Sequence, residues 1–456
     1  MNRISRILVA NRGEIAARII RACKEMGIST VLAASEADKD SLPARLADRV
    51  ICIGPPPARD SYLRPEYLVT AALGTSCEAI HPGYGFLSER AELAEMCERS
   101  GVIFIGPSSK NIRDMGDKVA ARETARRAGV PTIPGSEKVK DLKEAVEAGR
   151  QLGFPVMVKA AAGGGGRGMA IIETADRLEQ VFASLSFEVH SAFGDATLFL
   201  ERYFPNSRHV EVQIIGDHFG KAIHLFERDC SIQRRHQKVI EEAPCPFLNE
   251  KERKAICGAA LHLALAIGYV SCGTVEFLVD QDTRQFFFLE MNTRIQVEHP
   301  ITEEITGIDI VKEQIGIAGG RPLRFSQKGV AVKGHAIECR VNAESPDRNF
   351  APCPGAVLTW APPAGNGIRL ETHCYPGYRI PPFYDSLIAK LIVRGKDRAE
   401  AVLATQSALR DFQIEGVETT LPFLRAVTAH PDFKASQVST NWLEKVFMHQ
   451  FRKGAG

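Results

Sequence analysis

The stretch FFFLEMNTRIQVEHPITEE, residues 286–304, decides the fold, because an apolar segment runs directly into a dense group of polar side chains. Residues 286–289 have the aromatic and aliphatic bias of a buried β-strand. Polar residues then occupy every second position, which in an extended chain places their side chains on one face. They are Glu290, Asn292, Arg294, Gln296 and Glu298. Such a face fits a strand end that reaches solvent, or a site for an ion, a phosphate or a substrate.

A second strand that carries one carboxylate precedes this stretch. Residues 273–280, GTVEFLVD, alternate in polarity, and the link over residues 281–284 is short enough for an antiparallel hairpin. In the register that places Glu276 opposite Glu290, the two carboxylates lie about 5 Å apart with Asn292 on the diagonal. A shift of one residue would separate them onto opposite faces. Two carboxylates and an amide suit Mg²⁺ or Mn²⁺, so we predict a metal site on this hairpin.

Length and composition bound the rest of the interpretation. A chain of 456 residues favours two to four domains. The net charge of +2 indicates neither a nucleic acid partner nor a membrane. The 11 cysteines contain no Cys-x-x-Cys pair, which speaks against a zinc ribbon and for reduced thiols in the cytoplasm. The first residues include only a short apolar run, so we expect neither a signal peptide nor a membrane span.

The first region is typical of a doubly wound α/β domain. Residues 7–9 form an apolar strand pattern, a helical spacing follows the turn at residues 11–13, and residues 30–34 repeat the strand pattern. This βαβ unit lacks the three-glycine fingerprint of dinucleotide sites, so a structural role for the turn is favoured. We predict an N-terminal domain over residues 1–114.

The second region begins with a helix that opens at residues 115–118. We predict that this region is a domain over residues 115–330, with a lid at about 131–203. A strand pattern over residues 154–159 ends in a lysine and enters the glycine-rich stretch 160–169. The backbone N–H groups of such a loop can approach phosphates closely. Loops of this kind also serve as linkers, and no Walker motif follows.

Two further polar patterns lie in this region. His209, Glu211 and Gln213 share one face of an alternating strand, for which solvent exposure is the simplest expectation. The charged run ERDCSIQRRHQK, residues 227–238, contains few apolar residues. We therefore expect a solvated loop there, with an anion site as the alternative.

The third region, for which we predict residues 331–456, is typical of an α+β domain. Residues 334–342 form a strand pattern with Glu338, Arg340 and Asn342 on one face. Short strands separated by proline-rich turns follow, and residues 397–409 have the spacing of an amphipathic helix.

Together these motifs resemble those of biotin carboxylase, the ATP-grasp component of the biotin-dependent carboxylases. The matching segments lie in order from residue 10 to about residue 391 and are ANRGEIAARI, HPGYGFLSE, MGDK, VKAAAGGGGRGM, ERDCSIQRRHQK, GTVEFL, EMNTRIQVEHPITE, HAIECRVNAE and YDSLIAKL. The resemblance implies a multidomain α/β and α+β fold, with a Rossmann-like N-terminal domain, an ATP-grasp central domain with a glycine-rich lid, and an α+β C-terminal domain.

The resemblance also implies one site for ATP, Mg²⁺ or Mn²⁺, bicarbonate and biotin. Its nucleotide residues would be Lys118 and Lys159 at the phosphates, Gly165 and Gly166 as the lid, Glu201, Arg202, Tyr203 and Phe204 around the adenine, and His209, Gln233 and His236 as further contacts. Its metal ligands would be Glu276, Glu290 and Asn292. Bicarbonate would lie among Lys238, Arg294, Gln296 and Val297, with Glu298 as its general base and Arg340 facing the biotin ureido oxygen.

The implied reaction is ATP-dependent carboxylation of biotin through carboxyphosphate. One alternative is another ATP-grasp ligase that makes an acyl phosphate, which has no need for the set of Arg294, Glu298 and Arg340. A second is a catalytically silent nucleotide-binding regulator, although every position expected to do chemistry carries a competent residue.

The resemblance implies partners as well. They are a biotin carboxyl carrier protein, a carboxyltransferase subunit and a second copy of the chain in a homodimer. None of the 8 methionines is followed directly by lysine, and the chain ends at Gly456, so we expect biotin to be attached to another polypeptide. The final acceptor, whether acetyl-CoA, propionyl-CoA, pyruvate or another compound, stays open.

Overall fold

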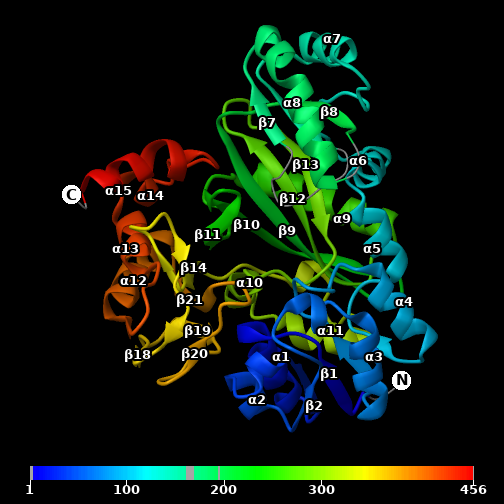
Figure 1. Ribbon diagram of the computed structural model, residues 1–456, viewed down its shortest axis with the longest axis vertical. Helices are drawn as coiled ribbons and strands as arrows, with labels where there is room; N and C mark the ends of the chain where they lie inside the picture. The colour runs from blue at the N-terminus through cyan, green and yellow to red at the C-terminus, as the bar shows by residue number, and fades with distance from the viewer. Residues whose placement is uncertain (1–3, 161–168, 194–195, 455–456) are drawn as a thin grey trace.

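The structure is a computed structural model that describes residues 4–160, 169–193 and 196–454. The chain folds into three parts (Figure 1). The N-terminal part lies at the bottom of the view and the C-terminal part lies on the left. The third, central part includes a small sheet with two helices at the top.

The N-terminal part is a parallel five-stranded sheet in the order β3-β2-β1-β4-β5. Its strands and helices are β1 (Arg6–Val9), α1 (Gly13–Glu25), β2 (Ser29–Ala34), α2 (Leu42–Leu46), β3 (Arg49–Cys52), α3 (Pro65–Gly74), β4 (Ala79–His81), α4 (Ala91–Arg99), β5 (Ile103–Phe104) and α5 (Ser109–Gly116). Ile7 and Val9 face one hydrophobic cluster and Leu8 faces another, so the sheet is buried on both sides. The predicted βαβ unit is confirmed by β1, α1 and β2.

The central part combines two sheets. Its elements are α6 (Lys118–Arg127), α7 (Leu142–Leu152), β6 (Val156–Ala160), β7 (Met169–Ile172), α8 (Ala175–Phe193), β8 (Leu198–Arg202), β9 (Ser207–Gly216), β10 (Ala222–Arg234), β11 (Gln237–Ala243), α9 (Glu250–Ala266), β12 (Ser271–Asp280), β13 (Phe286–Asn292), α10 (His299–Thr306) and α11 (Ile310–Ala318). The small antiparallel sheet has the order β7-β6-β8 and carries α7 and α8 at the top of Figure 1.

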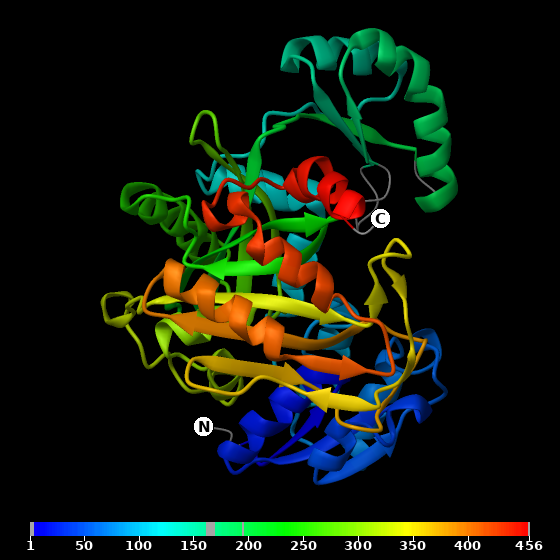
Figure 2. The same cartoon turned by 90° about the vertical axis from the view of Figure 1, so that its left-hand side faces the viewer.

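The C-terminal part continues the large sheet of the central part. Its elements are β14 (His335–Asn342), β15 (Glu344–Ser345), β16 (Ala351–Pro352), β17 (Gly355–Ala356), β18 (Thr359–Ala361), β19 (Ile368–Thr372), β20 (Arg379–Ile380), β21 (Leu387–Gly395), α12 (Arg398–Asp411), β22 (Gln413–Glu415), α13 (Leu421–Ala429), α14 (Pro431–Lys434) and α15 (Met448–Gly454), the last preceded by a π-helical turn at Leu443–Phe447. Helices α12 and α13 cover one side of its strands and share a hydrophobic core with them (Figure 2).

One antiparallel sheet therefore joins the two parts, in the order β13-β12-β9-β10-β11-β14-β21-β19. Strand β11 pairs with β14, with Glu241 opposite Glu338. The predicted domain boundary at residue 330 falls in the connection before β14 and does not interrupt this sheet. The division of the chain into three domains stays a prediction.

The hairpin prediction is confirmed in its register. Strands β12 and β13 pair antiparallel, with Glu276 opposite Glu290 and Thr274 opposite Asn292. The polar face beyond them is different from the prediction, because β13 ends at Asn292 and residues 293–298 are irregular. Arg294, Gln296 and Glu298 therefore do not continue one extended strand.

Two expectations of solvent exposure were wrong. Most of the run 227–238 belongs to β10, and residues 227–233 are buried between β9 and β11 rather than forming a solvated loop. Glu211 and Gln213, on the alternating face of β9, are fully buried as well. The physical reason is pairing, because the buried Arg228 guanidinium donates to Glu211 at 2.5 Å and to Gln213 at 2.9 Å.

In the described part of the chain, no helix combines the length and apolarity that a bilayer crossing needs. All eleven cysteines are free thiols.

Candidate active site

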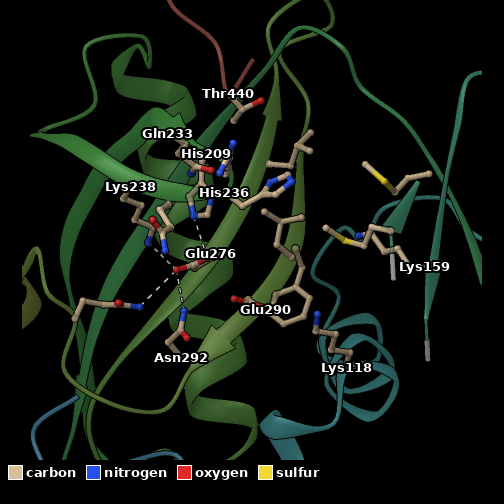
Figure 3. A pocket seen from close by; sticks show the side chains of 18 of the residues that line it. Lys118, Lys159, His209, Gln233, His236, Lys238, Glu276, Glu290, Asn292 and Thr440 are labelled. Carbon is tan, nitrogen blue, oxygen red and sulfur yellow. Dashed lines mark hydrogen bonds and ion pairs between the residues drawn. The ribbon is translucent and has the colours of Figure 1, made fainter. Parts of the chain in front are cut away.

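A cavity of about 1640 Å³ lies where the three parts meet. The predicted site residues that the structure describes line this cavity, with one exception. Glu298 lies behind the wall, in contact with the lining residues Lys238 and Arg340. Gly165 and Gly166 lie outside the described residues. Figure 3 shows the cavity with Lys118 and Lys159 on one side and the β12–β13 hairpin opposite them.

Two lysines and one carboxylate form one end of the cavity. Lys118 is the first residue of α6, whose N-cap Asp117 accepts hydrogen bonds from the next backbone N–H groups. Lys159 extends from β6 and contacts Glu201 on the neighbouring β8 at 2.5 Å. Arg122 approaches the same carboxylate at 3.6 Å. This end therefore presents several cations to the cavity, which suits a polyphosphate.

An apolar slot lies beside these cations. Phe204 is buried and stacks on Phe287 with ring centroids 5.0 Å apart. Ile133 completes this small cluster. Arg202 lies over the Phe204 ring at 5.6 Å, and the Tyr203 hydroxyl accepts a hydrogen bond from Asn441 at 2.8 Å. A flat aromatic base fits such a slot, in keeping with the predicted adenine position.

The opposite wall carries the hairpin carboxylates. One Glu276 oxygen accepts from Lys238 at 2.9 Å and from Asn292 at 2.8 Å, and the other lies 2.9 Å from the imidazole of His209. Burial alone would raise the pKa of Glu276, but Lys238 and His209 lower it well below its usual range. Glu276 is therefore ionised in the folded protein.

Glu290 differs from its neighbour across the hairpin. Burial and the adjacent Glu276 carboxylate raise the pKa of Glu290, and Lys118 offsets this only in part. The repulsion between these two carboxylates tests the predicted metal ligands, because a divalent cation bound between them would remove it. The oxygen donors of Glu276, Glu290 and Asn292 match the preference of Mg²⁺ and Mn²⁺, so the residues present fit the ion.

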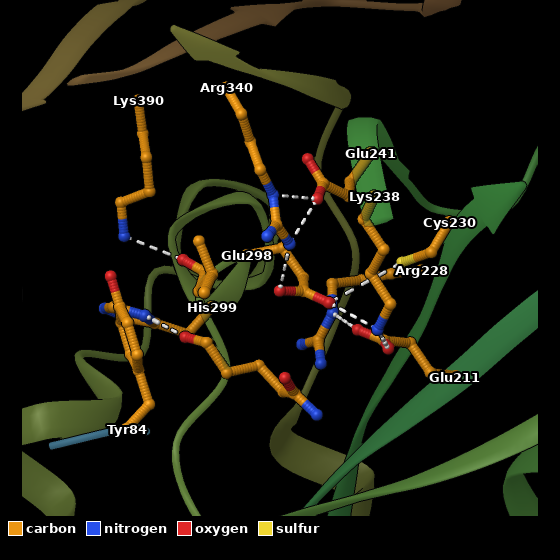
Figure 4. Close-up of polar contacts among 12 residues, drawn as sticks. Tyr84, Glu211, Arg228, Cys230, Lys238, Glu241, Glu298, His299, Arg340 and Lys390 are labelled. Carbon is orange, nitrogen blue, oxygen red and sulfur yellow. Dashed lines mark hydrogen bonds and ion pairs between the residues drawn. The ribbon is translucent and has the colours of Figure 1, made fainter. Parts of the chain in front are cut away.

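A cluster of alternating charges surrounds Glu298 (Figure 4). This carboxylate is fully buried, accepts from Lys238 at 2.7 Å and from Arg340 at 2.9 Å, and is the residue just before α10. Burial acts to raise its pKa, but Lys238, Arg340 and Arg228 together hold the pKa of Glu298 well below its usual range. The cluster thus contains an ionised carboxylate shielded from solvent.

The cations of this cluster are themselves paired. Lys238 also contacts Glu211 at 2.5 Å, and Arg340 donates to Glu241 at 2.6 Å. Glu211 and Glu241 are fully buried residues that the sequence did not identify as part of the site. The signal for Glu211 was its place between His209 and Gln213 on one face of β9, for which exposure was the simpler expectation.

Arg294, Gln296 and Val297 come from the irregular segment after β13. Arg294 donates to Gln296 at 2.9 Å and to Asn292 at 3.2 Å, so it ties the segment to the hairpin. Its guanidinium also pairs at 2.8 Å with Glu89 of the N-terminal part, a second contact that sequence reasoning missed. Burial acts to lower the pKa of Arg294, but the pairing with Glu89 raises it above its usual value.

The remaining predicted residues are His209 on β9, Gln233 near the end of β10 and His236 at the β10–β11 turn. Gln233 is buried and donates to the carbonyl of Cys230 at 2.8 Å. His236 is exposed at the turn and lines the cavity. His209 is buried deeply enough to lower its pKa, but Glu276 raises it above the usual value. The structure therefore brings all the described members of the predicted set to one cavity and its immediate wall.

Comparison with protein families gives matches along most of the chain. Residues 3–112 match the family described as "Biotin carboxylase, N-terminal domain" and residues 338–445 match "Biotin carboxylase C-terminal domain". Residues 117–326 match "Carbamoyl-phosphate synthase L chain, ATP binding domain".

Relatives and a solved structure agree with these matches. Biotin carboxylase 1 of Bacillus subtilis is 49% identical over 97% of this chain and 98% of its own length. One pyruvate carboxylase subunit, from Methanothermobacter thermautotrophicus, is 49% identical over 99% of this chain and 90% of its own length. The biotin carboxylase domain dimer of 2-oxoglutarate carboxylase from Hydrogenobacter thermophilus, solved with MgADP, ADP and bicarbonate, has a TM-score of 0.92 and 47% identity over 97% of each chain.

Proposed function

The chain belongs to the biotin carboxylase family of ATP-dependent ligases, and from that premise we propose how its residues carry out the reaction. ATP and bicarbonate meet in the central cavity, bicarbonate is activated as carboxyphosphate, and the carboxyl group passes to biotin. The observation that carries this proposal is the buried Glu298 carboxylate, held between Lys238 and Arg340, two residues that line the cavity.

We propose that Glu298 is the general base for bicarbonate. Its two cationic neighbours keep it ionised, which a base requires, but they also weaken it as a proton acceptor. A bicarbonate ion that accepts hydrogen bonds from Lys238 and Arg294 would draw Lys238 away from Glu298. The pKa of Glu298 would then rise at the moment when its substrate is bound. Gln296 and Val297, from the same segment, would orient the anion.

We propose that the nucleotide occupies the other end of the cavity. Lys118 and Lys159 would neutralise the phosphates, and the slot at Phe204 would take the adenine. His209, Gln233 and His236 would contact the sugar and phosphates. Glu276, Glu290 and Asn292 would hold Mg²⁺ or Mn²⁺, and the bound ion would neutralise charge on the terminal phosphate. The part of residues 131–203 that carries Lys159 and Glu201 would act as a lid that keeps water from carboxyphosphate.

We propose that Arg340 also faces the ureido oxygen of biotin. Its guanidinium donates to both Glu241 and Glu298, which fixes it at the cavity wall. A fixed cation there would stabilise negative charge that develops on the ureido oxygen when N1 is deprotonated.

Partners and location extend this proposal. A dimer of the related Hydrogenobacter domain supports a homodimer of this chain. A carrier protein that bears biotin and a carboxyltransferase subunit would complete the enzyme, in line with a relative described as one subunit of pyruvate carboxylase. Eleven free cysteines and the bacterial biotin carboxylases among the relatives support a cytoplasmic location.

The test of the proposed function is bicarbonate-dependent ATP cleavage by the purified chain. We expect cleavage to require both bicarbonate and Mg²⁺, and to rise on addition of biotin, most strongly when the biotin is attached to a carrier domain. An ATP-grasp ligase for another acid would cleave ATP with that acid but without bicarbonate. A silent regulator would bind ATP and cleave none.

A further inference from the structure

A fully buried lysine lies under the segment that carries Glu298. Lys390, on β21, has no exposed surface. Its ammonium group donates to the backbone carbonyl of Val297 at 2.7 Å and pairs with Glu14 of the N-terminal part at 3.1 Å. Burying a lysine costs free energy unless its ammonium group is paired with a carboxylate or donates hydrogen bonds. Lys390, from the C-terminal part, thus contacts both the N-terminal part, at Glu14, and the segment of the central part that carries Glu298.

The register of the large sheet places Lys390 beside Arg340. The two residues are direct partners across β21 and β14, so their side chains leave the sheet on one face. Figure 4 shows both reaching from the sheet toward the segment that precedes His299. Arg340 holds the side chain of Glu298 at 2.9 Å, and Lys390 holds the carbonyl of the residue before it at 2.7 Å. Two adjacent strands therefore clamp two consecutive residues.

The groups that face Lys390 do not compete for this contact. Burial raises the pKa of Glu338 well above its usual range, which disfavours the charged form of this neighbour. Glu371, opposite Lys390 on β19, is engaged by Arg369 at 2.7 Å. His299 has a pKa well below its usual value because it is buried near Lys390 and two arginines, so it carries no charge. Glu14 is the buried carboxylate that is paired with the ammonium, and it also accepts from the hydroxyl of Tyr84.

We propose that Lys390 is a positioning residue for the general base, through its hydrogen bond to the Val297 carbonyl. The irregular segment 293–298 has no strand or helix to fix it. Without the lysine, Val297 would lose its anchor, and Glu298 would keep the side-chain contacts but not the backbone position that aims it at bicarbonate. Lys390 itself does not touch a substrate. This inference rests on the proposed function, because it assigns Lys390 to the same base.

The first variant is Lys390→Met, which keeps the length of the side chain and removes its donor. We expect bicarbonate-dependent turnover to fall about tenfold to a hundredfold, because a base displaced by a fraction of an ångström loses its alignment. The KM for bicarbonate should rise while the KM for ATP stays the same, a split that a general loss of stability would not produce. Lys396→Met, the same change at an exposed lysine just beyond β21, should leave both kinetic constants unchanged.

A double variant separates positioning from simple charge compensation. Lys390→Met leaves the Glu14 carboxylate buried without its cation, which by itself destabilises the fold. Adding Glu14→Gln removes that carboxylate, so the double variant should recover the melting temperature. Turnover can then be measured in the double variant even if the single variant does not fold. We expect turnover to stay low in the double variant. Recovery of turnover together with stability would overturn the proposal, since Lys390 would then only neutralise Glu14.

The unaltered protein is assayed in the same series. If it cleaves ATP with bicarbonate and Lys390→Met does so at the same rate and the same KM, the positioning role is wrong although the proposed function stands. If the unaltered protein shows no bicarbonate-dependent cleavage, the proposed function itself fails, and the role of Lys390 fails with it.

Discussion

Glu298 and Glu290 are two carboxylates of one cavity whose surroundings act in opposite directions. Glu298 lies among Lys238, Arg340 and Arg228, which hold its pKa well below the usual range. Glu290 lies across the hairpin from Glu276, and burial with this second carboxylate raises its pKa. The surroundings of Glu298 therefore favour its charged form, whereas those of Glu290 disfavour it.

Under the proposed function, this difference agrees with the kind of ligand assigned to each region, an anion near Glu298 and a cation at the β12–β13 hairpin. Lys238, which contacts Glu298, could share its N–H donors with an entering anion. A region with unbalanced carboxylates, such as the β12–β13 hairpin, is completed by a cation. Under the proposed function, the protein would separate an anion site near Glu298 from a cation site at the hairpin by the arrangement of its own charges.

The largest effect is expected from Glu298→Gln, which keeps the shape of the side chain and removes the base. Bicarbonate-dependent ATP cleavage should fall about a thousandfold, in line with the loss of a positioned general base. The rate is measured at saturating ATP and Mg²⁺. Glu400→Gln, the same change at a half-exposed residue of α12 that pairs with the exposed Lys396, serves as the control. A variant that retains more than about a tenth of the activity would move the base to another residue.

The next effect is expected from Arg340→Ser and should divide the two half-reactions. Carboxylation of biotin should fall about a hundredfold to a thousandfold, because a fixed cation at the developing oxyanion is lost. ATP cleavage without biotin should fall about tenfold or less, since Glu298 retains Lys238 at 2.7 Å.

Product formation and ATP cleavage are measured separately in this variant. Arg348→Ser, which removes an exposed arginine paired with Glu418, is its control and should change neither rate. An equal loss of both activities in Arg340→Ser would show that Arg340 acts only by holding Glu298.

The sequence predicted much of this cavity because the motifs were local. The two strands of the hairpin followed from strand patterns, but the pairing of Glu276 with Glu290 also depends on a β-bulge between Glu276 and Phe277 that these patterns do not show. The βαβ unit around α1 followed from hydrophobic periodicity. In both cases, short-range spacing indicates which strands and helices form.

The remaining features depend on partners that are distant in the sequence. The run 227–238 looked solvated because no local pattern shows that Arg228 is neutralised by Glu211 or that β10 lies between β9 and β11. The segment after Asn292 looked like a continued strand, because the contacts that bend it come from Glu89 and Lys390 in the other parts of the chain. Whether a charge can be buried depends on its partner, and the sequence does not show which two distant residues form a pair.

A smaller kinetic effect is expected from Glu290→Gln. Turnover of ATP should fall about tenfold to a hundredfold at limiting Mg²⁺, because one of two charged ligands becomes neutral. Raising the Mg²⁺ concentration should restore part of the rate, which is measured as the Mg²⁺ dependence of turnover. A variant with an unaltered Mg²⁺ dependence would remove Glu290 from the metal site.

The smallest effect is on stability, and its sign tests the comparison directly. A raised folded pKa means that the ionised Glu290 destabilises the fold at neutral pH, and that this cost is relieved as the pH falls through the folded pKa. A lowered folded pKa means that Glu298 stabilises the fold at neutral pH, and that this contribution is lost only below the ordinary glutamate pKa. Without metal at pH 7, Glu290→Gln should therefore raise the melting temperature by about 1–2 °C, and Glu298→Gln should lower it.

Addition of Mg²⁺ completes this test, because an ion that binds only the folded state stabilises it. The melting temperature of the unaltered protein should rise with Mg²⁺ and that of Glu290→Gln should rise less, so the two curves should approach each other and cross. The Glu298→Gln variant, whose hairpin is intact, should respond to Mg²⁺ like the unaltered protein. Shifts of the same sign for the two variants without metal would mean that the two carboxylates have similar surroundings, and the assignment of separate anion and cation sites would then be wrong.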